Sequence, residues 1–452
     1  MRRHIRRRVS LRTAAVAGGI ALAAAAATTA SATVTPSSSR TAAATAQSAP
    51  RTHDVEYFTG PGSHPRHLEV PAATPKRLLS ADHSHSLSAG EAAADGDVGS
   101  LVKNGPTADK LDVVFIGDGY TSGRQADFHA DARSKWDQMS AVEPYASYKD
   151  LFNVWTVDAV SNQSGVSGDP SKDVVKDTAL DSYFWCDGLE RLLCLDTGRV
   201  ESYAAKAPQA DLVVVLANSS KYGGAGYTVT SQVGYDGIAT ASSDHPDSDQ
   251  IAVHETGHSL GKLADEYFYP EYGTYTGAEP EESNATKLTA AQLTAQKKKW
   301  YRWIGQTSPD GGTVGAYEGG RYYPKGINRP TDNSIMRTLG REFSLPGREA
   351  MIAGFYRHAH VLSSGTAAGA AVKRTASVEV SVPKTASLKW YVDGAEVSAA
   401  RGRTSVTPAS LGVPSDGAAH TVTAKATDGT GAVKDPALRK QLADARTWKI
   451  TG

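Results

Sequence analysis

This sequence of 452 residues contains few cysteines and methionines and has no excess of charge of either sign. Lysine and arginine together number 48, aspartate and glutamate also number 48, and the formal net charge is therefore zero. A chain without excess positive charge gives no case for binding nucleic acid. Beyond the N-terminal stretch, no run is long and apolar enough to span a bilayer. We therefore expect neither a nucleic-acid partner nor stable membrane insertion.

Residues 1–32 have the composition of an export signal. Five arginines occur among the first eight residues, an Ala-rich apolar stretch follows, and Ala30-Ser31-Ala32 supplies the small residues of a cleavage site. Arg7-Arg8 also resembles the start of a twin-arginine signal. A transmembrane anchor is the weaker alternative, because the stretch is short. The sequence predicts a secreted, extracellular protein, with twin-arginine export as one route.

The only two cysteines, Cys186 and Cys194, lie close together in the sequence. In an exported chain such a pair is more typical of a local disulfide than of a metal site or a redox pair. We therefore predict a Cys186–Cys194 disulfide.

Composition and periodicity divide the chain after the signal into parts. Residues 33–105 are rich in Ala, Ser, Thr and Pro, which predicts a low-complexity linker or propeptide, with one more structured island at 54–58. Residues 106–365 alternate between strand and helix patterns, which predicts an α/β sheet covered by helices. The clearest patterns are strands at 112–117, 152–157 and 211–216 and a helix at 125–139.

A Ser/Gly/Ala-rich linker at 363–370 separates a C-terminal part with a different periodicity. Apolar residues there alternate with polar ones, and Asp393-Gly394 supplies a turn. We predict that residues 371–452 form a small β-sandwich of immunoglobulin-like type, able to bind a surface or another protein. We also expect that this part can be removed without loss of activity on small peptides.

The stretch around His254, Glu255 and His258 carries the clearest chemistry. Two histidines four residues apart lie on one face of a helix and can present two imidazoles to one metal ion. Glu255 is offset by one residue, where its carboxylate can reach a water molecule on the metal. This is the H-E-x-x-H arrangement of zinc peptidases. The alternative is an amphipathic helix with two incidental histidines.

A third ligand is available only if this helix stops soon after His258. A helix continued to Asp265 would carry that carboxylate about 10 Å along the axis, at about 1.5 Å per residue. Gly261 supplies the residue best able to turn the chain. Asp265 and Glu266 both follow it, and neighbours in an extended segment point to opposite sides. We favour Asp265, the shorter side chain and the nearer to the turn, with Glu266 as the alternative.

Two Gly-rich segments are candidates for the surroundings of such a metal site. Residues 223–227 (Gly-Gly-Ala-Gly-Tyr) form either a loop or an exposed sheet edge on which a peptide substrate pairs as an added strand. Residues 311–331 are irregular in pattern and rich in Gly, Tyr and Pro, which is typical of a cleft lining.

Taken together, the chain resembles the IgA-peptidase family of secreted bacterial zinc metallopeptidases, metzincin-like zincins. The resemblance covers residues 111–362. It is carried by residues 114–120, Glu143-Pro144-Tyr145, residues 218–224, residues 254–267 and Ser334-Ile335-Met336-Arg337. It implies a zincin-like catalytic domain, His254 and His258 as zinc ligands, Glu255 as general base and Met336 in a turn beneath the metal. The metzincin pattern places the third ligand at Ala264, which cannot bind a metal, whereas the Asp-Glu-Tyr ending here is similar to that of the family.

The resemblance implies a Zn²⁺-dependent endopeptidase acting on protein or peptide substrates. A zinc-activated water attacks the peptide carbonyl, Glu255 takes its proton, and a further donor stabilises the oxyanion. The candidates for that donor are Tyr267, Tyr322, Tyr323 and Arg337. The alternatives are a zinc hydrolase acting on cell-wall peptides or amides and a non-catalytic exported binding protein. Nothing in the sequence shows a pocket for an antibody hinge.

Overall fold

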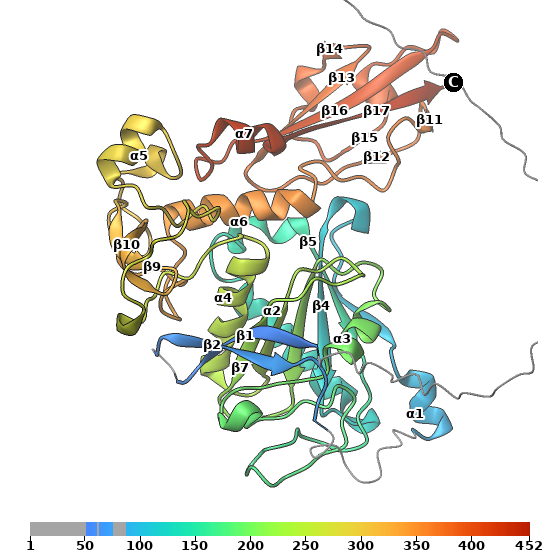
Figure 1. The fold of residues 1–452 in the computed structure, drawn as a ribbon. Helices are drawn as coiled ribbons and strands as arrows, with labels where there is room; N and C mark the ends of the chain where they lie inside the picture. Colours follow the sequence, from blue (N-terminus) through green and yellow to red (C-terminus); the bar gives the residue numbers. More distant parts are fainter. Residues whose placement is uncertain (1–50, 61–62, 76–86) are drawn as a thin grey trace, which may run out of the picture. The chain divides into compact units, whose positions relative to one another are not determined.

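The computed structural model describes residues 51–60, 63–75 and 87–452 (Figure 1). The predicted export signal at 1–32 lies outside these residues. Within the described part of the chain, no helix combines the length and the apolar character needed to cross a membrane.

An eight-stranded sheet, built from strands between residues 52 and 242, forms the centre of the part of the chain before the C-terminal sheets. In spatial order its strands are β2 (Pro65–Pro71), β1 (Thr52–Phe58), β7 (Gly224–Tyr227), β8 (Ile238–Ser242), β6 (Leu212–Ala217), β4 (Leu111–Asp118), β5 (Phe152–Val157) and β3 (Val98–Val102). The four strands β8, β6, β4 and β5 are mutually parallel, and the outer strands pair antiparallel. The predicted α/β class is confirmed, and β4, β5 and β6 lie within one residue of their predicted positions.

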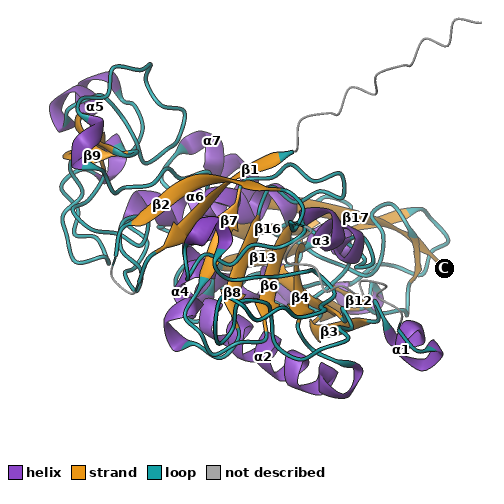
Figure 2. Ribbon diagram, turned by 60° about the horizontal axis from the view of Figure 1, so that its bottom comes forward, coloured by secondary structure: helices purple, strands orange, loops and turns teal. Residues whose placement is uncertain are grey.

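Helices lie on both faces of the sheet (Figure 2). Alternating side chains of its apolar strands pack against them. Val113 and Phe115 of β4 pack in one cluster with α2 (Gln125–Met139), α4 (Asp249–Ser259) and α6 (Leu345–His358). Val114 and Ile116 face the opposite side, toward α3 (Thr197–Ala204) and the loop that carries both cysteines. Burial on both faces explains the continuous apolar runs of the central strands.

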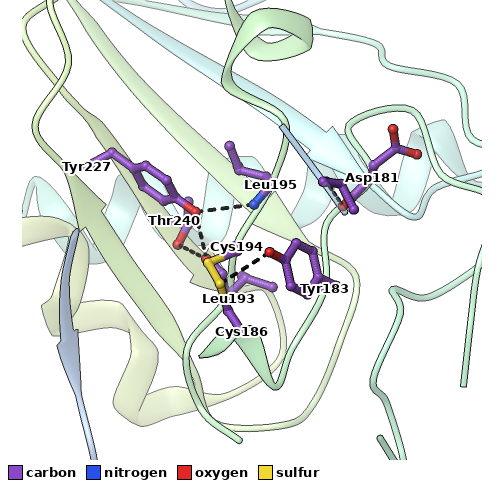
Figure 3. The surroundings of a disulfide bond; sticks show 9 residues. Asp181, Tyr183, Cys186, Leu193, Cys194, Leu195, Tyr227 and Thr240 are labelled. Carbon is purple, nitrogen blue, oxygen red and sulfur yellow. Dashed lines mark hydrogen bonds between the residues drawn. A yellow bond between two sulfur atoms is a disulfide. The ribbon is translucent and has the colours of Figure 1, made fainter. Parts of the chain in front are cut away.

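The loop that carries Cys186 and Cys194 packs against strands β7 and β8 (Figure 3). Cys186 and Cys194 form a disulfide. The hydroxyl of Tyr227 on β7 accepts a hydrogen bond from the Leu195 amide at 3.2 Å. Thr240 on β8 donates its hydroxyl to the Leu193 carbonyl at 3.5 Å and to the Ala225 carbonyl of β7 at 3.2 Å. The loop therefore supports β7 from the face away from α4.

The structure differs from the linker predicted at 33–105. Strands β1, β2 and β3 and the short helix α1 (Ala89–Ala94) all lie within that range, and the strands are part of the central sheet. The composition conceals them because few of their residues are apolar. Val55 and Val70 are fully buried, and Phe58 is 1% exposed. A strand added to an existing sheet needs little apolar surface of its own, since the sheet supplies its hydrogen-bond partners.

The segment predicted to be irregular at 311–331 contains a hairpin. Strands β9 (Tyr317–Gly320) and β10 (Tyr323–Arg329) pair antiparallel across a bulge. The helix α5 (Ala290–Gln296) precedes them. The two strands escape prediction because their Gly, Tyr and Pro residues interrupt any period-two pattern.

The C-terminal part contains two further sheets. The larger has the order β11 (Ala371–Lys373), β17 (Ala443–Thr451), β16 (His420–Asp428), β13 (Ala386–Val392) and β14 (Ala395–Glu396). The smaller pairs β12 (Val378–Glu379) with β15 (Ser405–Val406), and the short helix α7 (Pro436–Arg439) precedes β17. β11 pairs with β17 in parallel, the other strand pairs are antiparallel, and the immunoglobulin-like type remains a prediction.

This C-terminal part shares its core with the central sheet. Trp390 and Trp448 are both fully buried and belong to the same apolar cluster as Phe355 of α6. The hydroxyls of Tyr148 and Tyr356 both donate to one oxygen of Asp428, at 2.8 and 2.9 Å. Removal of residues after 370 would expose this apolar contact to water, so the packing argues against the predicted independence of the two parts.

We expect Asp428→Ala to destabilise the whole molecule. The substitution removes the carboxylate that accepts hydrogen bonds from two buried tyrosine hydroxyls, and each buried group that is left unsatisfied costs about 1–3 kcal/mol. The free energy of unfolding should fall by at least about 2 kcal/mol in a urea titration. The control is Asp173→Ala at an exposed position, for which a change within about 0.5 kcal/mol is expected. Equal stability of the two variants would mean that this contact adds nothing.

Candidate active site

Helix α4 presents both histidines to one point. The Nδ1 atom of His254 lies 2.9 Å from the Ile335 carbonyl oxygen, and that of His258 lies 2.7 Å from the Leu263 carbonyl oxygen. A carbonyl only accepts, so each Nδ1 carries the proton and each Nε2 presents a lone pair. The two Nε2 atoms are 3.2 Å apart. This tautomer, fixed by backbone carbonyls, is the one in which histidine ligates a metal through Nε2.

The chain turns directly after the helix, although the glycine acts differently from the prediction. The helix ends at Ser259, and the residue with left-handed backbone is Lys262, with φ of 48°. Gly261 is needed for close packing instead, since a Cβ there would stand 2.6 Å from the Gly257 carbonyl oxygen. The Leu263 amide then donates to that same oxygen at 3.1 Å. The turn reverses the chain within one helical turn of His258.

Asp265 and Glu266 point to opposite sides of the segment after the turn. Asp265 Oδ1 lies 3.3 Å from Nε2 of both His254 and His258. Glu266 faces away and accepts hydrogen bonds from the Ser334 hydroxyl at 2.8 Å and the Asn284 amide at 3.0 Å. Burial raises the pKa of the Glu266 carboxyl to about 7. The structure therefore brings Asp265, and not Glu266, to the two histidines.

A fourth group, which the sequence analysis missed, comes from strand β1. Glu56 places Oε1 3.2 Å from Nε2 of His254 and Oε2 3.1 Å from Nε2 of His258. One ligand atom from each of Glu56, His254, His258 and Asp265 lies within 4.8 Å of every other. No local spacing announces Glu56, which is 202 residues from His258. The strand-like island at 54–58 is the only signal in the sequence.

These four groups fit a bound cation. With both imidazoles donating through Nδ1, the cluster consists of two nitrogen lone pairs and two carboxylates that face one another. Asp265 Oδ1 is buried and receives no hydrogen bond. Burial lowers the pKa of His254, but the charge of Glu56 and the contact with Asp265 outweigh it and raise that pKa to about 10, so the carboxylates favour a positive charge at Nε2 that a bound cation would supply in place of a proton. Nitrogen and oxygen ligands of this kind suit zinc, which His254, His258 and Asp265 would hold.

Glu255 stands beside this cluster without belonging to it. It faces a cavity of about 150 Å³ whose lining includes Glu56, Gly226 and His258. Its Oε1 atom is buried without a hydrogen-bond partner. Burial and the charge of Glu56 raise the pKa of its carboxyl to about 8. A carboxylate with a raised pKa and a free oxygen is suited to accept a proton near neutral pH.

Gly226 on β7 makes room for that carboxylate. A Cβ at this position would stand 1.7 Å from Glu255 Oε2, closer than atoms can approach. The segment predicted as a loop or an exposed sheet edge is therefore a buried strand, paired by β1 on one side and β8 on the other, and Gly226 lets it approach α4 closely.

We expect Gly226→Ala to impair hydrolysis while the metal stays bound. The three atoms nearest to the added methyl group all belong to the Glu255 carboxylate, which it would displace. Because a general base contributes about 10²–10⁴-fold, a displaced base should lower kcat by at least about tenfold. Zinc content and kcat are to be measured on the same preparation. Gly223→Ala, which meets Phe184 and Arg191 instead, is the matched control on this segment. Unchanged kcat in Gly226→Ala would contradict the placement of Glu255.

Met336 lies beneath the histidine helix. A Cβ on Gly257 would stand 2.4 Å from its sulfur, so the methionine packs directly on α4 between the two histidines in sequence. Its carbonyl accepts a hydrogen bond from the Glu266 amide at 2.8 Å. The neighbouring Ile335 carbonyl is the one that orients His254. One short turn thus supports a histidine from below and fixes the segment that carries Asp265.

Of the four candidate oxyanion donors, two lie at the site. The Tyr267 hydroxyl donates to Glu56 at 3.1 Å, and the Tyr322 hydroxyl donates to Asp265 Oδ2 at 2.7 Å. Tyr323 packs among other tyrosine rings, with its ring centroid 5.2 Å from that of Tyr275. Arg337 donates to the Asp332 carbonyl at 2.7 Å. Only Tyr267 and Tyr322 have hydroxyls in contact with the metal-ligand candidates.

Two histidines one helical turn apart, a carboxylate beside them and an aspartate returned by a turn define a site of metallopeptidase type. The family model described as IgA Peptidase M64 matches residues 100–311 and 307–355. The chain belongs to this family, and it is therefore a peptidase of a metallopeptidase family. No curated protein matches the chain.

Proposed function

We propose that the chain is a secreted zinc-dependent endopeptidase in which Glu255 is the general base. One observation carries the proposal: two Nε2 lone pairs and Asp265 Oδ1 converge within 3.3 Å of one another, while Glu255 projects beside them from the same helix with a free oxygen. Membership of a peptidase family supports it.

The mechanism divides the work between the metal and the side chains. When bound, zinc would acidify a water molecule and polarise the substrate carbonyl. His254, His258 and Asp265 hold the metal, and the Ile335 and Leu263 carbonyls keep the imidazoles in their ligating tautomer. Glu255 accepts the proton of the attacking water and delivers it to the leaving amine. Tyr267 and Tyr322 place hydroxyl donors where an oxyanion can accept them.

The proposal extends to the organisation of the chain. We assign the export signal to residues 1–32, a zincin-like catalytic domain to 106–365 and an immunoglobulin-like part to 371–452. The mixed sheet with α4 on one face supports the second assignment. The antiparallel pairing of β13, β16 and β17 supports the third.

Casein and peptidoglycan, each incubated with and without a zinc chelator, test the proposal against its alternatives. We expect chelator-sensitive cleavage of casein, because membership of a peptidase family favours a polypeptide substrate. Cleavage of peptidoglycan alone would identify a cell-wall hydrolase. A binding protein would be favoured if neither substrate is cleaved. The protein tested must be shown to hold zinc and to keep one coordination position of the metal free for water or substrate.

A further inference from the structure

Strand β1 occupies the side of β7 on which the sequence predicts that a substrate pairs as an added strand. It pairs antiparallel with β7, and Val55 stands opposite Tyr227 and Glu56 opposite Gly226. Gly226 is the residue that lies against Glu255. On its other side β1 pairs with β2, so the β1–β2 hairpin extends the sheet next to the active site (Figure 2). An extended peptide that added to β7 would have to take the place of β1.

Glu56 is the residue of this hairpin that enters the metal cluster. Its side chain is 3% exposed, and each of its oxygens lies 3.1–3.2 Å from one histidine Nε2. Zinc in proteins is usually four-coordinate, and a catalytic site keeps one position for water or substrate. With His254, His258 and Asp265 as ligands, a carboxylate in Glu56's position fills the remaining one.

Contacts on both strands hold the hairpin in this place. Phe58 on β1 packs with Tyr222 and Ile251, and its ring meets that of His254 edge-on at 5.1 Å. On β2, His67 Nε2 lies 2.9 Å from the Tyr267 hydroxyl, and the Pro65 carbonyl accepts a hydrogen bond from Tyr269 at 2.6 Å. The hairpin therefore contacts helix α4 and the segment that carries Tyr267 and Tyr269.

We propose that the β1–β2 hairpin is a built-in inhibitor that keeps the chain latent, with Glu56 as the fourth ligand of the metal and β1 as a substitute for the substrate strand. The inference rests on the proposed function. Residues 52–71, which lie in the region predicted as a linker or propeptide, would then act as a propeptide. Because the hairpin is tethered to the site, its effective concentration there is on the order of millimolar or higher. A free peptide must compete with this high effective concentration of the hairpin.

The direct test measures access to the metal, independently of catalysis. Full-length protein carrying Glu255→Gln is loaded with Co²⁺, and acetohydroxamate binding is followed through the visible cobalt spectrum. Adding Glu56→Gln should tighten acetohydroxamate binding by at least about tenfold and shift the spectrum of the unliganded site. Glu69→Gln, at an exposed position of β2, is the matched control and should change neither. Glu56→Ala is the second variant, in case glutamine itself ligates the metal.

Peptidase assays with Glu255 intact separate this inference from the proposed function. Glu56→Gln should raise the initial rate on a fluorogenic peptide by at least about tenfold over the wild type. If the metal becomes accessible but neither protein cleaves peptides, the peptidase assignment fails and the blocking role of Glu56 stands. If affinity, spectrum and rate stay unchanged in both Glu56 variants, latency is refuted. Loss of metal from both Glu56 variants would also refute it, because Glu56 would then be a permanent ligand.

Discussion

Glu255→Gln is expected to reduce peptide hydrolysis by about 10²–10⁴-fold while zinc remains bound, which is the usual contribution of a general base. The carboxylate lies beside the metal cluster and is not one of its four members. Its amide replacement keeps the shape next to Gly226 but cannot accept a proton at neutral pH. Because Glu56 is proposed to block the site, the comparison is best made in the Glu56→Gln background.

Zinc content measured on the same Glu255→Gln samples makes this result specific. Retained zinc with lost turnover assigns the base, whereas lost zinc would make Glu255 a ligand. Near-normal turnover with zinc bound would contradict the mechanism.

Asp265→Ala is expected to weaken zinc binding by more than about 100-fold, since even residues that only orient a ligand contribute about 10–100-fold. Asp265 Oδ1 lies 3.3 Å from both histidine nitrogens, and among the residues that the structure describes the cluster contains one other carboxylate, that of Glu56. Dissociation constants are to be obtained by competition with a chromophoric chelator, again in the Glu56→Gln background.

Glu266→Gln is the matched control for this measurement. The glutamine keeps an acceptor for Ser334 and preserves the volume of a fully enclosed side chain, so zinc affinity should fall by less than about tenfold. The reverse order of the two variants would move the ligand to Glu266. Equal affinity in both would place the third ligand elsewhere.

The sequence predicts the local parts of this molecule well. Strands β4, β5 and β6 are apolar on both faces, and α2 repeats its apolar residues at helical spacing, so hydrophobic periodicity locates them within a residue or two. His254 and His258 are joined by the geometry of one helical turn. Asp265 follows from the opposite directions of neighbouring side chains, once the helix is known to end.

The parts that sequence reasoning misses depend on distant contacts or on backbone detail. Glu56 reaches His258 only because β1 joins the edge of β7, and no periodicity connects residues 202 apart. The left-handed residue of the turn is Lys262 rather than the neighbouring glycine, because Gly261 is required for its close packing on Gly257. Tyr323 and Arg337 have suitable chemistry, but tertiary packing gives them other partners.

Anomalous X-ray diffraction from a zinc-soaked crystal of the full chain, recorded on both sides of the zinc absorption edge, would locate the metal directly. We expect one strong zinc peak about 2.0–2.2 Å from Nε2 of His254, Nε2 of His258 and a carboxylate oxygen of Asp265. A zinc peak bound elsewhere, or none at these three side chains, would contradict this expectation.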